Sequence, residues 1–194
     1  LDFLLNQPDR YYKIAIKYIH PLAKKQPNVT HQMLAKLQQQ NLLKAVITQN
    51  IDGLHTKAGS QNVIEFHGDI LFFHCVNCGK KFDLPTVEQK LLQNSIPLCS
   101  CGNLIRPDIV FFGDPIPQQA VEKSLQLTQN AKTFIALGSS LAVQPAATLP
   151  TIAKDNNAAL YIITKGPTFL DRIADCKIDL PLKQFSQAVL NLLQ

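Results

Sequence analysis

The chain alternates between short apolar runs and longer stretches in which apolar residues recur every three or four positions. Short runs suit buried strands, and the longer spacing predicts helices with one face on the core. Such alternation is typical of a parallel sheet with helices on both faces. The expected strands are residues 45–48, 63–66, 109–112, 133–137 and 160–163, and the expected helices are 9–25, one capped by Thr30, 118–129, 145–154 and 185–193.

Residues 70–106 interrupt this alternation with cysteines, prolines and polar residues. We therefore expect a small module inserted into a larger α/β domain, which is formed by residues 1–69 and 107–194. Within the larger domain, the polar stretch Gln49–Asp52 directly follows an expected strand, where open α/β sheets bind ligands. Asn50 and Asp52 precede Gly53, so they are equally suited to forming a turn.

Four of the five cysteines form two close pairs, with twenty residues between the pairs. This spacing predicts a tetrahedral zinc site, although the second pair is one residue shorter than the usual C-x-x-C. Four thiolates leave no open coordination position, so the metal would be structural. Disulfides and reduced core thiols are the less favoured alternatives, and the fifth cysteine, Cys176, is expected to be a packing residue. The predicted ligands are Cys75, Cys78, Cys99 and Cys101.

Composition favours one folded unit without a membrane segment. The chain has 194 residues, of which 46% are hydrophobic, and its apolar runs are far below the roughly 20 residues that cross a bilayer. No secretory signal is recognisable in its first residues, so we expect a cytoplasmic protein. The net charge is +5, from 19 basic and 14 acidic residues. The basic residues form no stripe, so no specific nucleic-acid partner is expected.

The motifs Gln49-Asn50-Ile51-Asp52, His67-Gly68, the two cysteine pairs, Val110-Phe111-Phe112-Gly113-Asp114 and Gly138-Ser139-Ser140 follow one another in this order. In this series the chain resembles the sirtuin family of NAD-dependent protein deacylases over nearly its whole length. The resemblance implies a Rossmann-like NAD-binding domain (1–69 and 107–194) with a zinc-binding module (70–106). It also implies an NAD-dependent protein-lysine deacetylase that transfers acetyl to ADP-ribose and releases nicotinamide.

The resemblance further implies NAD as co-substrate, one structural zinc ion and an acylated-lysine protein or peptide as partner. His67 matches the general base that deprotonates a ribose hydroxyl, since a neutral imidazole accepts a proton near neutral pH. Asn50 and Asp52 match the residues that act in catalysis beside this base. The implied cofactor residues are Gln49, Asn50, Ile51, Asp52, Gly138, Ser139, Ser140 and Thr164, and the implied peptide-binding residues are Val110, Phe111, Phe112 and Gly113, although one of the two phenylalanines is expected to be core.

Two departures from the family pattern leave a second interpretation open. The family's first strand and its glycine-rich phosphate loop have no counterpart, because none of the eight glycines forms G-x-G. We therefore expect a gap in the sheet. Thr164 also stands where the family usually has asparagine, which predicts weaker NAD affinity. The alternative is a catalytically silent module that binds zinc and ADP-ribose; a zinc-ribbon nucleic-acid binder is a third and weaker hypothesis.

Overall fold

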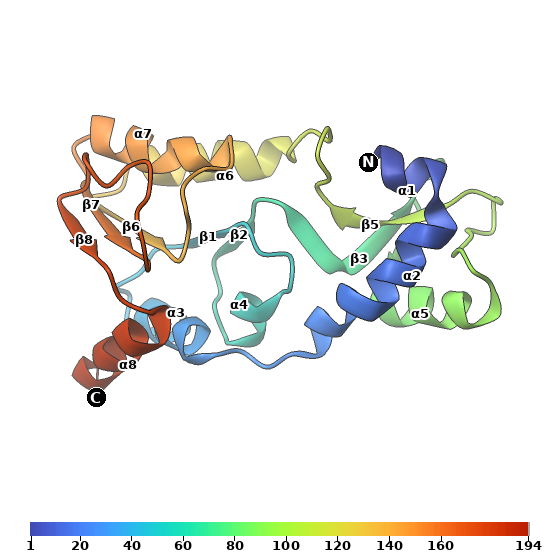
Figure 1. The fold of residues 1–194 in the computed structure, drawn as a ribbon, viewed down its shortest axis with the longest axis horizontal. Helices are drawn as coiled ribbons and strands as arrows, with labels where there is room; N and C mark the ends of the chain where they lie inside the picture. The colour runs from blue at the N-terminus through green and yellow to red at the C-terminus, as the bar shows by residue number, and fades with distance from the viewer. Residues whose placement is uncertain (194) are drawn as a thin grey trace.

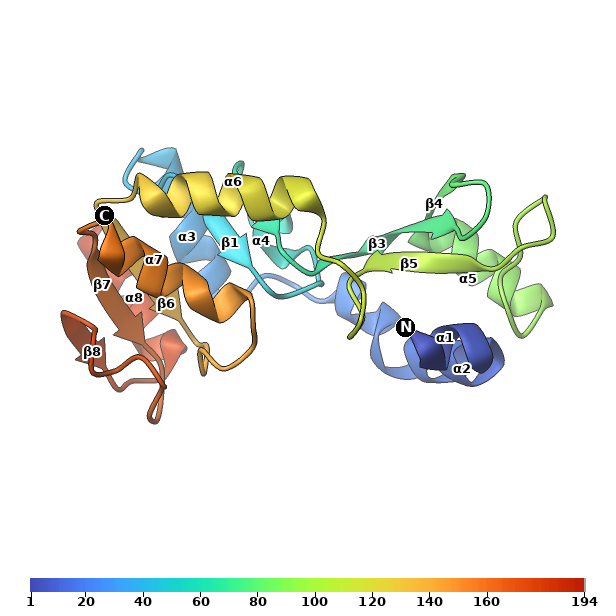
Figure 2. The same cartoon turned by 90° about the horizontal axis from the view of Figure 1, so that it is seen from above.

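The chain forms two lobes that lie end to end along the long axis of the molecule (Figures 1 and 2). The computed structural model describes residues 1–193. One lobe contains the parallel strands and the C-terminus, and the other contains an antiparallel sheet and the first helices. No helix within residues 1–193 is long and apolar enough to cross a bilayer.

The parallel lobe contains five short strands in two groups. Strand β1 (Val46–Thr48) pairs only with β2 (Val63–Glu65), and β6 (Thr133–Leu137) pairs with β7 (Ala159–Ile163), which pairs with β8 (Cys176–Ile178). Because β1 and β6 do not bond to one another, the parallel strands form two separate sheets. The interruption agrees with the gap expected from the sequence.

Helices cover both faces of the parallel strands, which confirms the predicted α/β fold. Helices α6 (Gln118–Gln129) and α7 (Leu149–Asp155) lie on one side, and α3 (Val29–Gln39) and α8 (Leu182–Leu192) lie on the other (Figure 1). The short helices η2 (Ala146–Thr148) and α4 (Leu54–Lys57) complete this lobe.

The antiparallel lobe is built around the strand order β4–β3–β5. Its strands are β3 (Gly68–Cys75), β4 (Lys81–Asp83) and β5 (Ile105–Ile109), and its helices are α1 (Asp2–Asn6), α2 (Pro8–Tyr18), η1 (His20–Lys24) and α5 (Leu84–Gln93). Side chains of α1, α2, α5 and the sheet share one core. The buried Tyr12 hydroxyl donates to the Ile105 carbonyl across 93 residues of sequence. This core places α1 and α2 beside the cysteine module. The predicted domain boundaries at residues 70 and 106 stay a prediction.

Several element boundaries differ from the sequence prediction for local reasons. The helix expected over 9–25 breaks after Tyr18, because Pro21 has no backbone N–H to continue the α-helical ladder. Asn28, not Thr30, caps α3, since its side chain accepts from two backbone N–H groups. Pro150 similarly separates η2 from α7 within the helix expected over 145–154.

The strand expected over 109–112 was also placed wrongly. The observed strand β5 ends at Ile109, and the next residues form a loop. Its apolar run does not mark a buried strand, because Phe112 is 95% exposed. Residues 118–129 and 133–137, by contrast, form a helix and a strand as predicted.

Candidate active site and metal centre

The polar stretch after β1 and the histidine after β2 meet in one cavity of about 380 Å³. Parallel pairing aligns Thr48 with Glu65, the last residue of each strand, so the residues that follow emerge at the same edge. Further bonds hold these strand ends, because the Phe66 N–H donates to the Thr48 carbonyl and the Asn50 N–H to the Thr48 hydroxyl. The cavity is lined by Leu22, Gln49, Asn50, Ile51, Asp52, His67, Ile109 and Val110.

The half-buried His67 ring is oriented by the backbone of the neighbouring strand end. Its Nδ1 lies 3.2 Å from the carbonyl oxygen of Gln49. A carbonyl only accepts hydrogen bonds, so this contact requires the proton on Nδ1 and leaves Nε2 free to accept one. The geometry is therefore compatible with a general base.

Gly68 holds His67 against β5, a role that the sequence analysis missed. Its φ is +78°, and a Cβ there would lie 2.0 Å from the Asp108 carbonyl oxygen, so only glycine fits. This close approach lets the Val110 N–H donate to the His67 carbonyl at 2.9 Å. The glycine directly after the histidine was the available signal.

Asp52 forms the turn that was expected as one of its two roles. Its Oδ1 accepts from the Leu54 N–H at 3.0 Å, and Gly53 adopts a φ of +67°. Only one carboxylate oxygen takes part in this turn, so the turn is compatible with ligand binding by the other oxygen.

Two further carboxyl groups lie near Asp52 and were not foreseen. Burial, the charge of Asp69 and the hydrogen bond that Glu65 donates to Asp69 together raise the pKa of Glu65 to about 7. Burial also raises the pKa of Asp69, against hydrogen bonds that lower it. Glu65 is therefore partly protonated near neutral pH, because the neighbouring Asp69 and Asp52 charges disfavour its ionisation.

The segment Val110–Gly113 directly follows β5 and lies beside His67. Val110 lines the cavity, and the partly buried Phe111 ring lies edge-on to Tyr11 at 5.6 Å. Phe112 is 95% exposed. Phe111 is thus the core residue of the pair, as expected for one of the two, whereas Phe112 is free to contact a partner.

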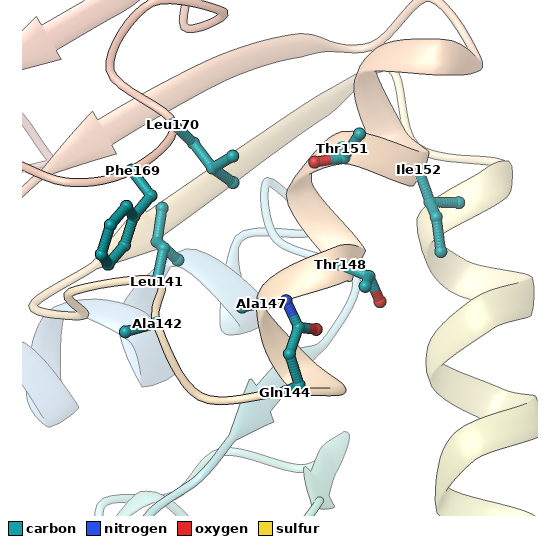
Figure 3. Close-up of a pocket in the computed structure, with 9 residues that line it drawn as sticks. All are labelled: Leu141, Ala142, Gln144, Ala147, Thr148, Thr151, Ile152, Phe169 and Leu170. Atoms are coloured by element: carbon teal, nitrogen blue, oxygen red, sulfur yellow. The ribbon is translucent and has the colours of Figure 1, made fainter.

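The remaining predicted cofactor residues do not line the His67 cavity. A second cavity of about 690 Å³ lies where the loop after β6 faces α7 and Phe169 (Figure 3). Its lining begins at Leu141, directly after Gly138, Ser139 and Ser140. Ser139 Oγ accepts from the Leu141 N–H, so it forms a turn. A Cβ on Gly138 would lie 2.6 Å from Leu182, which gives this glycine a packing role. Cofactor binding by Gly138, Ser139, Ser140 and Thr164 stays a prediction.

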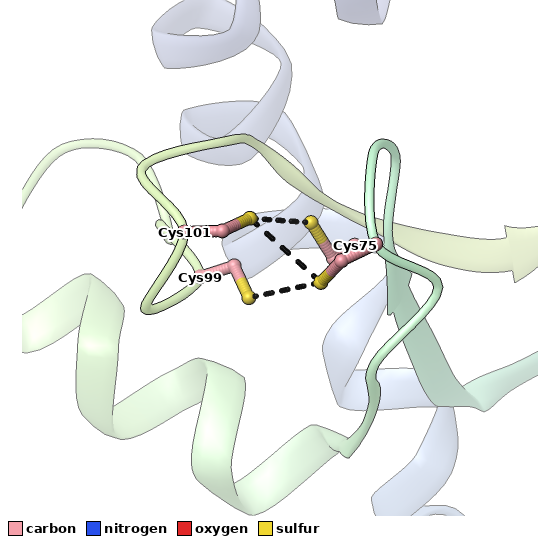
Figure 4. Close-up of side chains that lie close together, drawn as sticks. Cys75, Cys99 and Cys101 are labelled. Atoms are coloured by element: carbon pink, nitrogen blue, oxygen red, sulfur yellow. Dashed lines mark hydrogen bonds between the residues drawn. The ribbon is translucent and has the colours of Figure 1, made fainter.

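The four predicted metal ligands converge at the end of β3 and the loop before β5. Their sulfur atoms lie within 4.8 Å of one another, and three of the sulfur pairs are 3.4, 3.6 and 3.7 Å apart (Figure 4). Zinc–sulfur bonds of about 2.3 Å in a tetrahedron give sulfur separations of roughly 3.8 Å. All five cysteines are free thiols. The arrangement therefore fits tetrahedral zinc and excludes disulfides within the cluster.

Comparison with known proteins supports the same interpretation. The model of the Sir2 family matches residues 1–145. An NAD-dependent protein deacetylase of Thermotoga maritima is 43% identical over 191 residues, which cover 98% of this chain and 78% of that protein. NAD-dependent protein deacetylase 1 of Pyrobaculum aerophilum is 43% identical over 176 residues, with 90% and 69% covered.

Solved structures agree over the same range. A structure of Sir2 with a p53 peptide and NAD+ matches with a TM-score of 0.96 at 43% identity, and covers 98% of this chain and 80% of that one. A structure of Sir2 bound to an acetylated peptide matches with a TM-score of 0.97 at 42% identity, with 98% and 81% covered. The shared fold, the cysteine cluster and the family match together show that this chain belongs to the Sir2 family, the sirtuins.

Proposed function

We propose that this chain is an NAD-dependent protein-lysine deacetylase, which produces deacetylated protein lysine, nicotinamide and O-acetyl-ADP-ribose. Its relatives carry this activity in their names, and its structural neighbours hold an acetylated peptide, NAD+ or 3′-O-acetyl-ADP-ribose. The observation that carries the proposal is the cavity that Asn50, Asp52 and His67 line together. These relatives favour the enzyme over the catalytically silent module.

The donor set of the cavity fits the nicotinamide ribose end of NAD. The amides of Gln49 and Asn50 can donate to and accept from ribose hydroxyls, and the Asp52 carboxylate can accept from the nicotinamide carboxamide. When bound, NAD supplies an electrophilic ribose carbon, nicotinamide as leaving group and a ribose hydroxyl as acetyl acceptor. Ile51 lies in the same wall of the cavity.

His67 is the proposed general base. With its proton on Nδ1, directed at the Gln49 carbonyl, its Nε2 can take the proton of the ribose hydroxyl. Its position in a cavity with Asn50 and Asp52 supports this role.

The acetyl-lysine peptide is proposed to lie along Val110–Gly113. This segment is outside β5, and the backbone groups that its turn does not use, such as the Phe112 N–H, can pair with an extended chain. Backbone pairing gives affinity with little demand on peptide sequence.

We further propose one structural zinc ion on the four clustered cysteines and a cytoplasmic location. Four cysteines without disulfide partners are typical of a reducing compartment such as the cytoplasm. Fluorescence microscopy of the tagged protein, with membrane and secreted fractions assayed alongside, tests the location.

The test is nicotinamide release from NAD by the full-length protein with an acetylated peptide. His67→Ala is expected to lower kcat by about 100-fold or more, the usual contribution of a general base. His74→Ala is the matched control, because His74 is a partly buried histidine of β3 that bonds Asp108 away from the cavity lining. Absence of turnover by the wild type, or equal turnover by both variants, would reject the proposal.

A further inference from the structure

Hydrogen bonds hold the loop Val110–Gly113 at both ends, and the bonds at the second end were not predicted from the sequence. At the first end, the Val110 N–H donates to the His67 carbonyl at 2.9 Å. At the second end, Asp114 closes a turn: its N–H donates to the Phe111 carbonyl at 2.9 Å, and its carboxylate accepts from the Phe111 N–H at 3.0 Å. Gly113 permits this turn with a φ of +92°.

Arg106 of β5 links this turn to the antiparallel sheet. Its guanidinium donates to the Asp114 carboxylate at 2.6 and 3.5 Å and to the Ile109 carbonyl at 3.1 Å. The same group lies 5.2 Å from the centre of the Phe111 ring. One side chain therefore contacts the strand end, the core aromatic residue and the closing residue of the loop.

The ion pair is shielded from solvent, unlike most surface pairs. The Arg106 and Asp114 side chains are 14% and 10% exposed. Burial alone would raise the pKa of Asp114, but hydrogen bonds from Arg106 and the Phe111 N–H lower it below its ordinary value. Asp114 is therefore ionised at neutral pH, and removing either partner leaves a largely buried charge unpaired.

We propose that Arg106 and Asp114 are positioning residues for the acetyl-lysine peptide. Between their contacts and His67, the loop presents the exposed Phe112 side chain and the Phe112 N–H, which the turn does not use, to the peptide. Without the pair, the free loop samples other conformations. Peptide binding must then order the loop, and this cost weakens the affinity for the peptide. This inference rests on the proposed function and names the residues that set its peptide affinity.

The experiment measures steady-state kinetics of Arg106→Met, Asp114→Asn and the double variant, with peptide and NAD varied separately. We expect each single variant to raise the peptide KM by about tenfold, the effect of losing a hydrogen bond to a charged group. We expect kcat and the NAD KM to change less than about threefold, because the pair holds the Asp114 end of the loop, whereas the bond between Val110 and His67 holds the end that lines the cavity. The double variant should resemble the single ones, since the two residues act as a pair.

A matched control separates this role from a general loss of ion pairs. Lys81→Met removes a different cation from the same sheet, one that pairs with Asp108 at 2.9 Å but is 72% exposed. It is expected to leave the peptide KM unchanged. Zinc content and melting temperature of every variant are measured alongside. If Arg106→Met does not fold, Arg106→Lys, which keeps the charge but loses the two-pronged contact, carries the same comparison.

Fluorescence anisotropy of a labelled acetyl-peptide measures peptide binding without turnover. It therefore tests the positioning role separately from the proposed enzyme activity. Wild-type binding without turnover would reject the enzyme, and a tenfold weaker binding by Asp114→Asn would still support the positioning role. An unchanged peptide affinity in folded variants of both residues would overturn the inference. An equal loss in the peptide KM, the NAD KM and kcat would also overturn it, since that result indicates a purely structural role.

Discussion

The antiparallel sheet β4–β3–β5 and the parallel sheet β6–β7–β8 both bury apolar side chains, but they expose apolar residues in different settings. In the first, Phe73 and Ile105 are at most 1% exposed, and residues of α1 and α2 close the core over them. In the second, Ile135 of β6 and Tyr161 of β7 are 46% and 37% exposed. Parallel sheets are normally covered on both faces. Leu160 and Ile162 of β7 are nevertheless fully buried, and Phe72 of β3 is 55% exposed. One exposed face is ordinary for an antiparallel sheet, so the unusual feature is the exposure of Ile135 and Tyr161 on parallel strands.

Metal removal is expected to have the largest effect and to affect the two sheets differently. Cys99→Ser removes a buried ligand, and structural zinc contributes about 10 kcal/mol or more to the folding of small zinc domains. The antiparallel lobe should therefore lose its protection from hydrogen exchange, whereas α6 and β7 should keep most of theirs. Elemental analysis should find one zinc in the wild type and in Cys176→Ser, the control outside the cluster. Equal loss of protection in both lobes would break the distinction.

Core truncation is expected to have the next largest effect. Phe73→Ala removes a side chain that is 1% exposed, which should reduce the free energy of unfolding by about 3–5 kcal/mol. Ile135→Ala, at a position that is 46% exposed, should reduce it by less than about 1 kcal/mol. Urea denaturation of both variants checks the comparison. Similar losses would indicate that the open face of β6 is covered in solution.

Acid is expected to affect the helices beside the parallel strands by a smaller amount. Burial, followed by the neighbouring His31, lowers the pKa of His55 to about 4, against the opposing charge of Asp52. An unfolded histidine titrates near pH 6.5, so the unfolded state takes up a proton that the folded state does not. Stability should therefore fall as the pH decreases from about 6.5 towards 4.

The measurement is the melting temperature against pH for the wild type and His55→Gln. The difference between the two proteins isolates this histidine from acid release of the metal. A smaller acid-dependent loss in His55→Gln is expected. Parallel curves for the two proteins would remove His55 as the cause.

Much of the candidate site was predictable because its signals are local. Gln49–Asp52 directly follows an apolar run, and the cysteine spacing is visible without a fold. The structure brings the first group and His67 to one cavity and the four sulfurs to one cluster. Helix 118–129 and strand 133–137 were predictable for the same reason, since their periodicity is uninterrupted.

The features that were missed depend on contacts between distant residues. No pattern near Tyr12 indicates that its hydroxyl will meet Ile105, so the association of α2 with the cysteine lobe was not foreseen. Similarly, the apolar run after Ile109 resembles a strand, but the bonds of Arg106 and Asp114 turn it into a loop. Proline and cap positions shifted the helix boundaries by their local chemistry.

The backbone hydrogen bond between Val110 and His67 connects the proposed peptide-binding loop to the proposed general base. A change that moves the main chain at Val110 is expected to move His67 as well, whereas Arg106 and Asp114 hold the other end of the loop. Attempts to redesign acyl-peptide preference should therefore begin at the outward-facing side chain of Phe112, where new contacts can be added without moving that link.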